Sequence, residues 1–146
     1  MPSEQESEVS EVVAGDGYAV ANIEALGDRY GFRKVRGPLG VNAFGANAIV
    51  IPGNWETGRH YHEQQEELYF VHDGTIEFEF GDGSKHVLGR GGVARVDAST
   101  VRKIRNLTDD DAVYLVVGGK DGYVGRDGKL PEGEENRFGS AELPKS

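Results

Sequence analysis

Cysteine is absent from this sequence of 146 residues, and its absence removes several kinds of site. Without a thiol the chain can form no disulfide, no cysteine-ligated metal centre and no thiol nucleophile. No apolar run approaches the roughly 20 residues of a membrane helix, so we expect no membrane partner. The first residues contain neither a basic region nor an apolar stretch, so we expect no signal peptide and a cytoplasmic location.

Positive charge is also scarce. The chain has 16 Lys and Arg residues against 25 Asp and Glu residues, which gives a formal net charge of -9. An average field of this sign repels nucleic acid. The densest basic stretch, Arg90 to Arg105, lies on a strand-like segment whose side chains alternate between two faces, so it forms no single patch. We therefore expect no nucleic-acid partner.

Proline is rare, with 5 residues, whereas glycine is abundant, with 22 and no collagen period. The glycines therefore mark turns, and many turns in a short chain favour an all-β fold. The segment Ala112–Val117 is apolar almost throughout, which predicts burial on both faces. Seven segments have the residue content and spacing of strands: 47–51, 67–71, 75–80, 84–88, 93–96, 101–106 and 112–117.

The two ends of the chain differ from its middle. Residues 1–12 are acidic and predict a flexible N-terminal tail, and the glycine-rich residues 119–146 predict a C-terminal extension. The domain is then expected over 13–118. Residues 26–34 show no clear period and predict a loop or a single helical turn. The pair Asp73-Gly74 predicts a hairpin between the strands on either side of it.

Two histidines give the strongest chemical signal. His60 and His62 are two residues apart in a segment that leads into a strand, and strand alternation places both imidazoles on one face. Two imidazoles and a carboxylate suit a divalent ion of Zn, Fe, Mn, Ni or Cu. Glu66 and Glu67 compete for the carboxylate role. If Tyr69 faces the interior, Glu67 does too, but both faces carry apolar residues, so strand parity alone leaves the choice open.

This segment resembles the first motif of the cupin superfamily, which has a glycine, His-x-His, a glutamate and a second glycine. The chain has Gly53, His60-Tyr-His62, four residues, Glu67, six residues and Gly74. The spacing to Gly74 selects Glu67, while the gap after Gly53 is one residue longer than usual. The resemblance covers about residues 41–117. It implies a cupin-type double-stranded β-helix, a jelly-roll barrel, with His60, His62 and Glu67 as metal ligands.

The family's second motif keeps its spacing here but not its chemistry. Aligning Gly91 with the motif places Arg102 where the family has its fourth ligand, a histidine, and Asn106 where it has a closing asparagine. A guanidinium has no available lone pair and stays charged, so Arg102 cannot ligate a metal. The site therefore has at most three protein ligands beside a fixed positive charge.

Two functions follow from this reading. The first is a small metalloenzyme for an anionic, oxygen-bearing substrate, in which Arg102 anchors the acidic group and Tyr69 can supply a phenol. The resemblance implies a dioxygenase, isomerase, cyclase or decarboxylase without choosing among them. The second is a non-catalytic module that binds a small anionic ligand through Arg102, with or without metal. In its metal-free form Arg102 makes a salt bridge to Glu67 or to an Asp, the metal site is degenerate, and Tyr69 is a core residue.

The remaining expectations concern other histidines and assembly. His72 precedes a turn and His86 lies in a short connecting strand, so both are expected to be surface residues. The resemblance to cupins also implies a homodimer, because such barrels often pair through N-terminal strands or sheet faces, and pairing protects exposed sheet edges.

Overall fold

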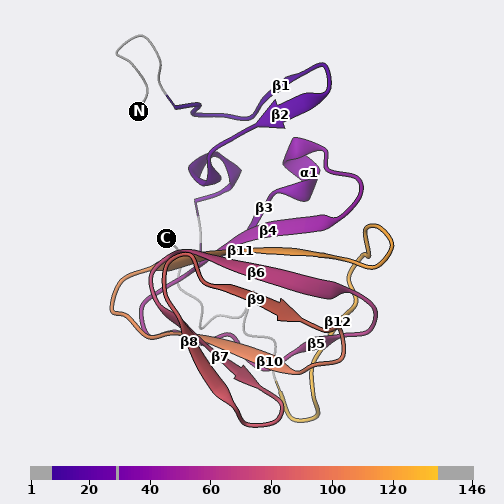
Figure 1. The fold of residues 1–146 in the computed structure, drawn as a ribbon. Coiled ribbons are helices and arrows are strands. Elements are labelled where there is room, and N and C mark those ends of the chain that lie inside the picture. Colours follow the sequence, from indigo (N-terminus) through magenta and orange to yellow (C-terminus); the bar gives the residue numbers. More distant parts are fainter. Residues whose placement is uncertain (1–7, 29, 135–146) are drawn as a thin grey trace.

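The structure, a computed structural model, describes residues 8–28 and 30–134. Its main body is two antiparallel sheets packed against each other (Figure 1). The larger has the order β3-β4-β11-β6-β9 and the smaller the order β10-β7-β8. Their bounds are β3 Gly31–Lys34, β4 Gly45–Ile51, β6 Glu66–Asp73, β9 Val93–Val96, β11 Ala112–Gly119, β7 Ile76–Phe80, β8 Lys85–Leu88 and β10 Arg102–Asn106.

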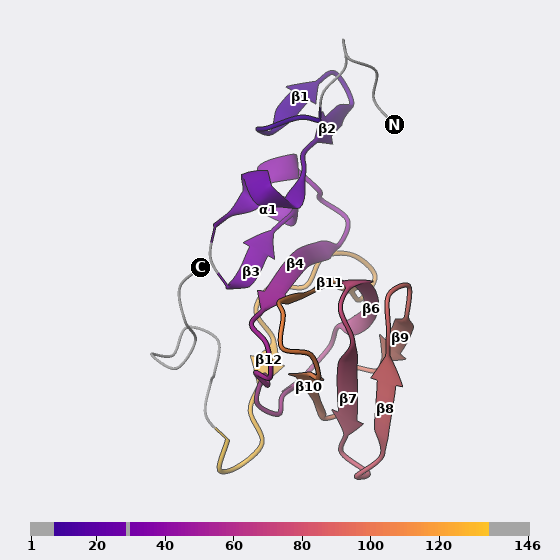
Figure 2. The same ribbon diagram turned by 90° about the vertical axis from the view of Figure 1, so that its left-hand side faces the viewer.

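Short elements complete the fold. A hairpin of two strands near the N-terminus stands away from the two sheets (Figure 2). A pair of two-residue strands, β5 and β12, joins the segment before β6 to the C-terminal segment. The bounds are β1 Val13–Gly15, β2 Tyr18–Val20, η1 Ile23–Leu26, α1 Arg36–Leu39, β5 Tyr61–His62 and β12 Gly128–Lys129.

The core lies between the two sheets and is built from the inward side of alternating strands. In β6, Tyr69 and Val71 are buried while their neighbours are exposed, as period-2 alternation requires. The Tyr69 ring packs edge-to-face on Phe78 of the other sheet, with ring centroids 5.1 Å apart. All seven predicted strands are present within one or two residues of their expected ends, which confirms the all-β class.

The predicted hairpin at Asp73-Gly74 is wrong. β6 pairs with β9 and β11, whereas β7 pairs with β8 and β10, so this turn carries the chain from one sheet to the other. Gly74 has φ 91°, and a Cβ there would lie 2.9 Å from Cβ of Ala112. A glycine is therefore required where the chain crosses between the sheets, because the backbone is left-handed there and Ala112 lies too close for a side chain. The pair Asp-Gly has the same residue types in a crossing of this kind as in a hairpin turn, so the sequence cannot distinguish the two.

Two further expectations need correction. β11 is not buried on both faces: its side chains alternate between buried and half-buried, because the outer face of the large sheet is only partly covered. Residues 26–34 are not one loop or turn. They include the end of the 3-10 turn η1 and the edge strand β3, whose alternation is too short to register in the sequence.

Part of the predicted domain organisation lies outside the described residues, namely residues 1–7 of the expected tail and 135–146 of the expected extension. Across the described part of the chain, no helix is long and apolar enough to cross a membrane. The boundaries at residues 12 and 118 remain predictions.

Candidate metal centre

The two histidines and one glutamate meet at one end of the space between the sheets. The ligand atoms of His60, His62 and Glu67 all lie within 4.8 Å of one another. The two imidazole rings are perpendicular, with centroids 5.3 Å apart. Glu67 lies on β6 and His62 on β5, while His60 is paired with Arg102 of β10 by two backbone hydrogen bonds of 3.0 and 2.9 Å. The cluster therefore joins both sheets.

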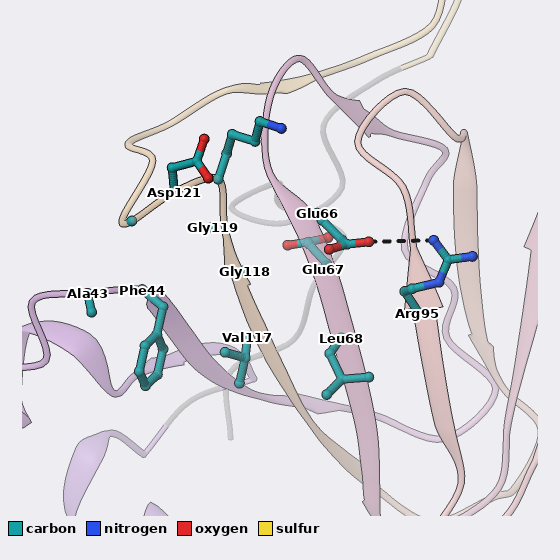
Figure 3. Close-up of a pocket in the computed structure, with 12 residues that line it drawn as sticks. Ala43, Phe44, Glu66, Glu67, Leu68, Arg95, Val117, Gly118, Gly119 and Asp121 are labelled. Carbon is teal, nitrogen blue, oxygen red and sulfur yellow. Dashed lines mark hydrogen bonds and ion pairs between the residues drawn. The ribbon is translucent and has the colours of Figure 1, made fainter.

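Burial separates the two competing glutamates. Glu67 is 8% exposed and points inward with Tyr69, whereas Glu66 is exposed and lies 3.5 Å from Arg95 on the outer face (Figure 3). The neighbouring strand makes room for Glu67 at Gly118. A Cβ at that position would lie 2.4 Å from Oε1 of Gln65, 3.1 Å from the Glu66 carbonyl oxygen and 3.3 Å from Cγ of Glu67. A larger residue would therefore displace the Gln65 side chain and press on the Glu67 side chain.

Three groups converge on one oxygen of Glu67. Its Oε1 accepts a hydrogen bond of 2.6 Å from the Tyr69 hydroxyl and lies 3.2 Å from Nε2 of His62 and 3.7 Å from Nη2 of Arg102. Burial alone would raise the pKa of Glu67, but these three groups outweigh it and lower the pKa. Within the described part of the chain Oε2 has no hydrogen-bond or ion-pair partner. Glu67 is thus an ionised carboxylate with one oxygen available.

His60 is a neutral imidazole. Burial, followed by the charge of Arg102, lowers the pKa of His60 from its usual 6.5 to about 4. A neutral imidazole keeps one nitrogen lone pair, which is the form that binds metal ions.

His62 lies between two carboxylates. Its Nε2 faces Glu67, and its Nδ1 lies 2.8 Å from Oδ1 of Asp127, a buried residue of the C-terminal segment. Burial would lower the pKa of His62, but Glu67 and Asp127 together raise it. Asp127 was not predicted from the sequence. It stands alone in a glycine-rich stretch, and Asp127-Gly128 has only the composition of a turn.

Arg102 is completely buried, with 0% of its surface exposed. Its Nη2 donates to the carbonyl of Asp97 at 3.2 Å and its Nη1 to the carbonyl of Ala98 at 3.5 Å. Its Nε has no hydrogen-bond partner among the residues that the structure describes. The guanidinium thus lies beside the cluster, as the second-motif spacing predicts. Of the two partners that the metal-free alternative allows, Glu67 or an Asp, it forms its ion pair with Glu67.

The other residues selected from the sequence have clear positions. The Tyr69 side chain belongs to the core, and its hydroxyl is directed at Glu67; burial and the Glu67 charge raise its pKa well above 10, so it remains a neutral donor. His72 and His86 are exposed, as expected. Neither joins the cluster.

The donor set fits a divalent ion. Zinc–nitrogen bonds of about 2.0–2.1 Å hold two ligand atoms of one ion at most about 4.2 Å apart, so ligand atoms within 4.8 Å need only small side-chain shifts. The neutral His60, the ionised Glu67 and the anchored His62 offer the nitrogen and oxygen donors that transition metals prefer. The Arg102 charge opposes a cation and is the one unfavourable feature of the site.

A groove of about 540 Å³ lies on the outer face of the large sheet, and Glu67 is the one cluster residue among those that line it (Figure 3). Phe44, Leu68 and Val117 give it an apolar floor, with Arg95 and Asp121 among the charged residues that line it. His60, His62 and Arg102 do not line this groove. The sheet strand β6 thus has two different faces, a polar inner end and an apolar outer surface.

Comparisons with known proteins support the fold. The family model for the cupin domain matches residues 47–118, and a search of the curated proteins gives no match. An uncharacterised protein from Klebsiella pneumoniae with a double-stranded β-helix domain aligns with a TM-score of 0.61 and 15% identity, over 77% of this chain and 96% of that one. A cupin protein from Bacteroides fragilis gives a TM-score of 0.57 and 22% identity, over 70% and 90%.

A DMSP lyase from Ruegeria pomeroyi gives a TM-score of 0.55 and 25% identity, over 62% of this chain and 45% of that one. Against three of the solved structures that it matches, the chain spans about half of their length, between 44% and 57%. The family match and these neighbours agree with the two-sheet topology and confirm the double-stranded β-helix. The chain belongs to the cupin superfamily.

Proposed function

We propose that this cupin holds one divalent metal ion on His60, His62 and Glu67 and acts on a small anionic, oxygen-bearing substrate. The observation that most directly supports the metal is the convergence of the three ligand residues, whose donor atoms lie within 4.8 Å of one another. A bound ion would supply Lewis-acid chemistry, or an oxygen site if it is iron.

Arg102 is the residue proposed to meet the acidic group of the substrate. Its two terminal nitrogens already contact backbone carbonyls and Glu67, which leaves Nε as a buried donor without a partner in the described part of the chain. A buried cation in a fixed position favours a carboxylate or an enolate that develops beside it. In this proposal Tyr69 orients Glu67, because its hydroxyl donates a hydrogen bond of 2.6 Å to Oε1 of that carboxylate.

The reaction type is a separate proposal. Dioxygenase, isomerase, cyclase and decarboxylase reactions all remain compatible with a three-ligand site and a nearby cation. The likeness to the Ruegeria pomeroyi DMSP lyase adds a lyase reaction and names one compound to assay, DMSP itself. Cleavage of DMSP by the metal-loaded protein would select this reaction, and its absence would exclude DMSP as the substrate.

The metal itself is tested by titration. Metal-depleted protein is titrated with Zn²⁺, Mn²⁺ and Fe²⁺ while the ion is followed by competition with a chromophoric chelator. We expect one ion per chain in the wild type and a loss of binding in His60→Ala and Glu67→Ala. His72→Ala and His86→Ala are matched controls, because both histidines are exposed and distant from the cluster. Equal binding by all five proteins would refute the proposal.

One observation favours the second candidate, a binding module without metal. Arg102 forms an ion pair with Glu67 at 3.7 Å and is completely buried, so the site already contains a cation. In that case a small anionic ligand would bind without added metal and its affinity would depend on Arg102. The same titration separates the two, because this candidate predicts no stoichiometric metal in the wild type.

We also propose that two copies of the chain pair through the outer face of the large sheet. Leu68, Phe70 and Val93 on this face are 51%, 42% and 61% exposed, and Phe70 lies opposite Val93 across β6 and β9. Contiguous exposed apolar side chains of this kind mark interaction surfaces. Sedimentation should show a dimer that Phe70→Glu dissociates and that Val87→Glu, on the other sheet, leaves intact.

A further inference from the structure

The C-terminal segment crosses the loop that carries the histidines. β12 pairs with β5, with Gly128 opposite His62 (Figure 1). The carbonyl of Asp127 accepts a hydrogen bond of 3.2 Å from the Glu63 backbone, and Lys129 forms an ion pair of 3.1 Å with Glu63. These contacts place the Asp127 side chain beside the ring of His62.

Among residues 8–28 and 30–134, the Asp127 carboxylate makes its hydrogen bonds with this loop. Oδ1 lies 2.8 Å from Nδ1 of His62 and accepts from Nε2 of Gln65 at 2.5 Å. Oδ2 accepts from the backbone nitrogens of Gln64 and Gln65 at 2.8 and 3.0 Å. The residue is 8% exposed, so protein donors rather than water satisfy both oxygens. A carboxylate in this position can only accept hydrogen bonds.

An acceptor at Nδ1 determines which nitrogen of His62 faces the cluster as a ligand. The proton on the Asp127 side must belong to Nδ1, because a carboxylate only accepts. When a metal ion takes the place of a proton between Nε2 and Glu67, the neutral ring therefore offers the Nε2 lone pair to that ion. Nε2 is the nitrogen that lies 3.2 Å from Glu67. Carboxylates that hold the second nitrogen of a metal-binding histidine fix both its ring orientation and its tautomer.

We propose that Asp127 is a positioning residue of the candidate metal centre, which holds His62 with Nε2 directed at the metal. This inference rests on the proposed function for its metal, but the contacts between Asp127 and the loop are present without a metal. Asp127 lies beyond residues 47–118, the part that the cupin family model matches. The hydrogen bond that holds His62 therefore comes from a segment outside the matched domain.

The test compares Asp127→Asn with Asp127→Ala. Asparagine has one oxygen, and the backbone donors of Gln64 and Gln65 cannot turn away from it. In its most favourable orientation the asparagine therefore keeps its side-chain oxygen as the acceptor for these two backbone nitrogens. Its NH₂ group then faces Nδ1 of His62, and the side-chain amide of Gln65 can flip to present its oxygen. Nδ1 must then accept, the proton moves to Nε2, and the lone pair facing the site is lost. Alanine leaves His62 free to adopt either tautomer.

We expect Asp127→Asn to weaken Zn²⁺ and Co²⁺ binding by roughly 10–100-fold. Asp127→Ala should weaken it less, although alanine lowers the thermal midpoint more because it removes the backbone hydrogen bonds. If Asp127 only anchored the loop through its backbone hydrogen bonds, asparagine would keep those bonds and alanine would lose them. Asp127→Ala would then bind metal more weakly than Asp127→Asn. Asp121→Asn, an exposed change in the same segment, should leave affinity unchanged. Weaker binding by alanine than by asparagine, or no loss in either, overturns the proposal.

A second readout does not need a metal. Long-range ¹H–¹⁵N spectra of the metal-free protein should show a proton on Nδ1 of His62 in the wild type and none there in Asp127→Asn. If the wild type binds no metal but shows this proton, the proposed function fails and the positioning of His62 by Asp127 stands. If Nδ1 has no proton in the wild type, the positioning role fails whether or not metal binds.

Discussion

Replacement of Arg102 by histidine should tighten metal binding. Arg102 lies opposite His60 in a backbone-paired bridge, so an imidazole at this position starts beside the existing ligands. Nη2 is 3.7 Å from Oε1 of Glu67, and a metal–oxygen bond adds about 2 Å, so the guanidinium lies within about 6 Å of a bound ion. At an effective dielectric constant of about 20, one charge repels a divalent ion at that distance by about 5 kcal/mol.

Solvent and side-chain rearrangement reduce this repulsion, but relief of a quarter of it corresponds to about tenfold in affinity. We therefore expect Arg102→His to bind Zn²⁺ at least tenfold more tightly. Arg102→Gln removes the charge without adding an imidazole, so it should show part of the gain. Arg95→His makes the same substitution at an exposed position and should change nothing.

The assay is chelator competition, with circular dichroism and thermal unfolding of each metal-free variant to confirm that it is folded. A folded Arg102→His protein whose Zn²⁺ affinity equals or falls below that of the wild type would refute the reasoning. It would mean that residue 102 does not stand at the fourth-ligand position, or that its charge does not act on the ion.

Three further substitutions test the surroundings of the site. Gly118→Ala should lower Zn²⁺ affinity, because its Cβ would displace the Gln65 side chain, which bonds to Asp127, and would lie 3.3 Å from Cγ of Glu67; unchanged affinity by chelator competition would contradict this. Tyr69→Phe should cost about 2 kcal/mol in urea unfolding, the value of a buried hydrogen bond to a charged group, whereas the exposed Tyr18→Phe should cost nothing. Asn106→Ala should cost about 2–3 kcal/mol in the same assay, because the Asn106 amide lies 2.8–3.3 Å from three backbone carbonyls; a loss under 1 kcal/mol would contradict this role.

The parts that could be predicted from the sequence are those with local signals. Runs of β-branched residues revealed the seven main strands, because burial on one face imposes period-2 spacing. The spacing of His60, His62 and Glu67 predicted a cluster that the structure does bring together. The spacing of the second motif from Gly91 placed Arg102 beside this cluster, where the structure shows it buried.

The parts that could not be predicted depend on contacts distant in the sequence. The two-residue strands β5 and β12 are too short for any periodicity, so their pairing exists only in the folded chain. Asp127 lies 65 residues from His62, and nothing in its glycine-rich neighbourhood distinguishes it from a turn residue. The pair Asp73-Gly74 has the residue types of a hairpin turn, yet Gly74 lies where the chain passes from one sheet to the other, in close contact with Ala112.

The most direct test of the central claim is anomalous diffraction from crystals of the protein grown with Zn²⁺, recorded on both sides of the zinc absorption edge. The account predicts one strong anomalous peak per chain, within about 2.0–2.2 Å of a nitrogen of His60, Nε2 of His62 and an oxygen of Glu67. No peak at these residues, or a peak that contacts Glu67 but neither histidine, would contradict it.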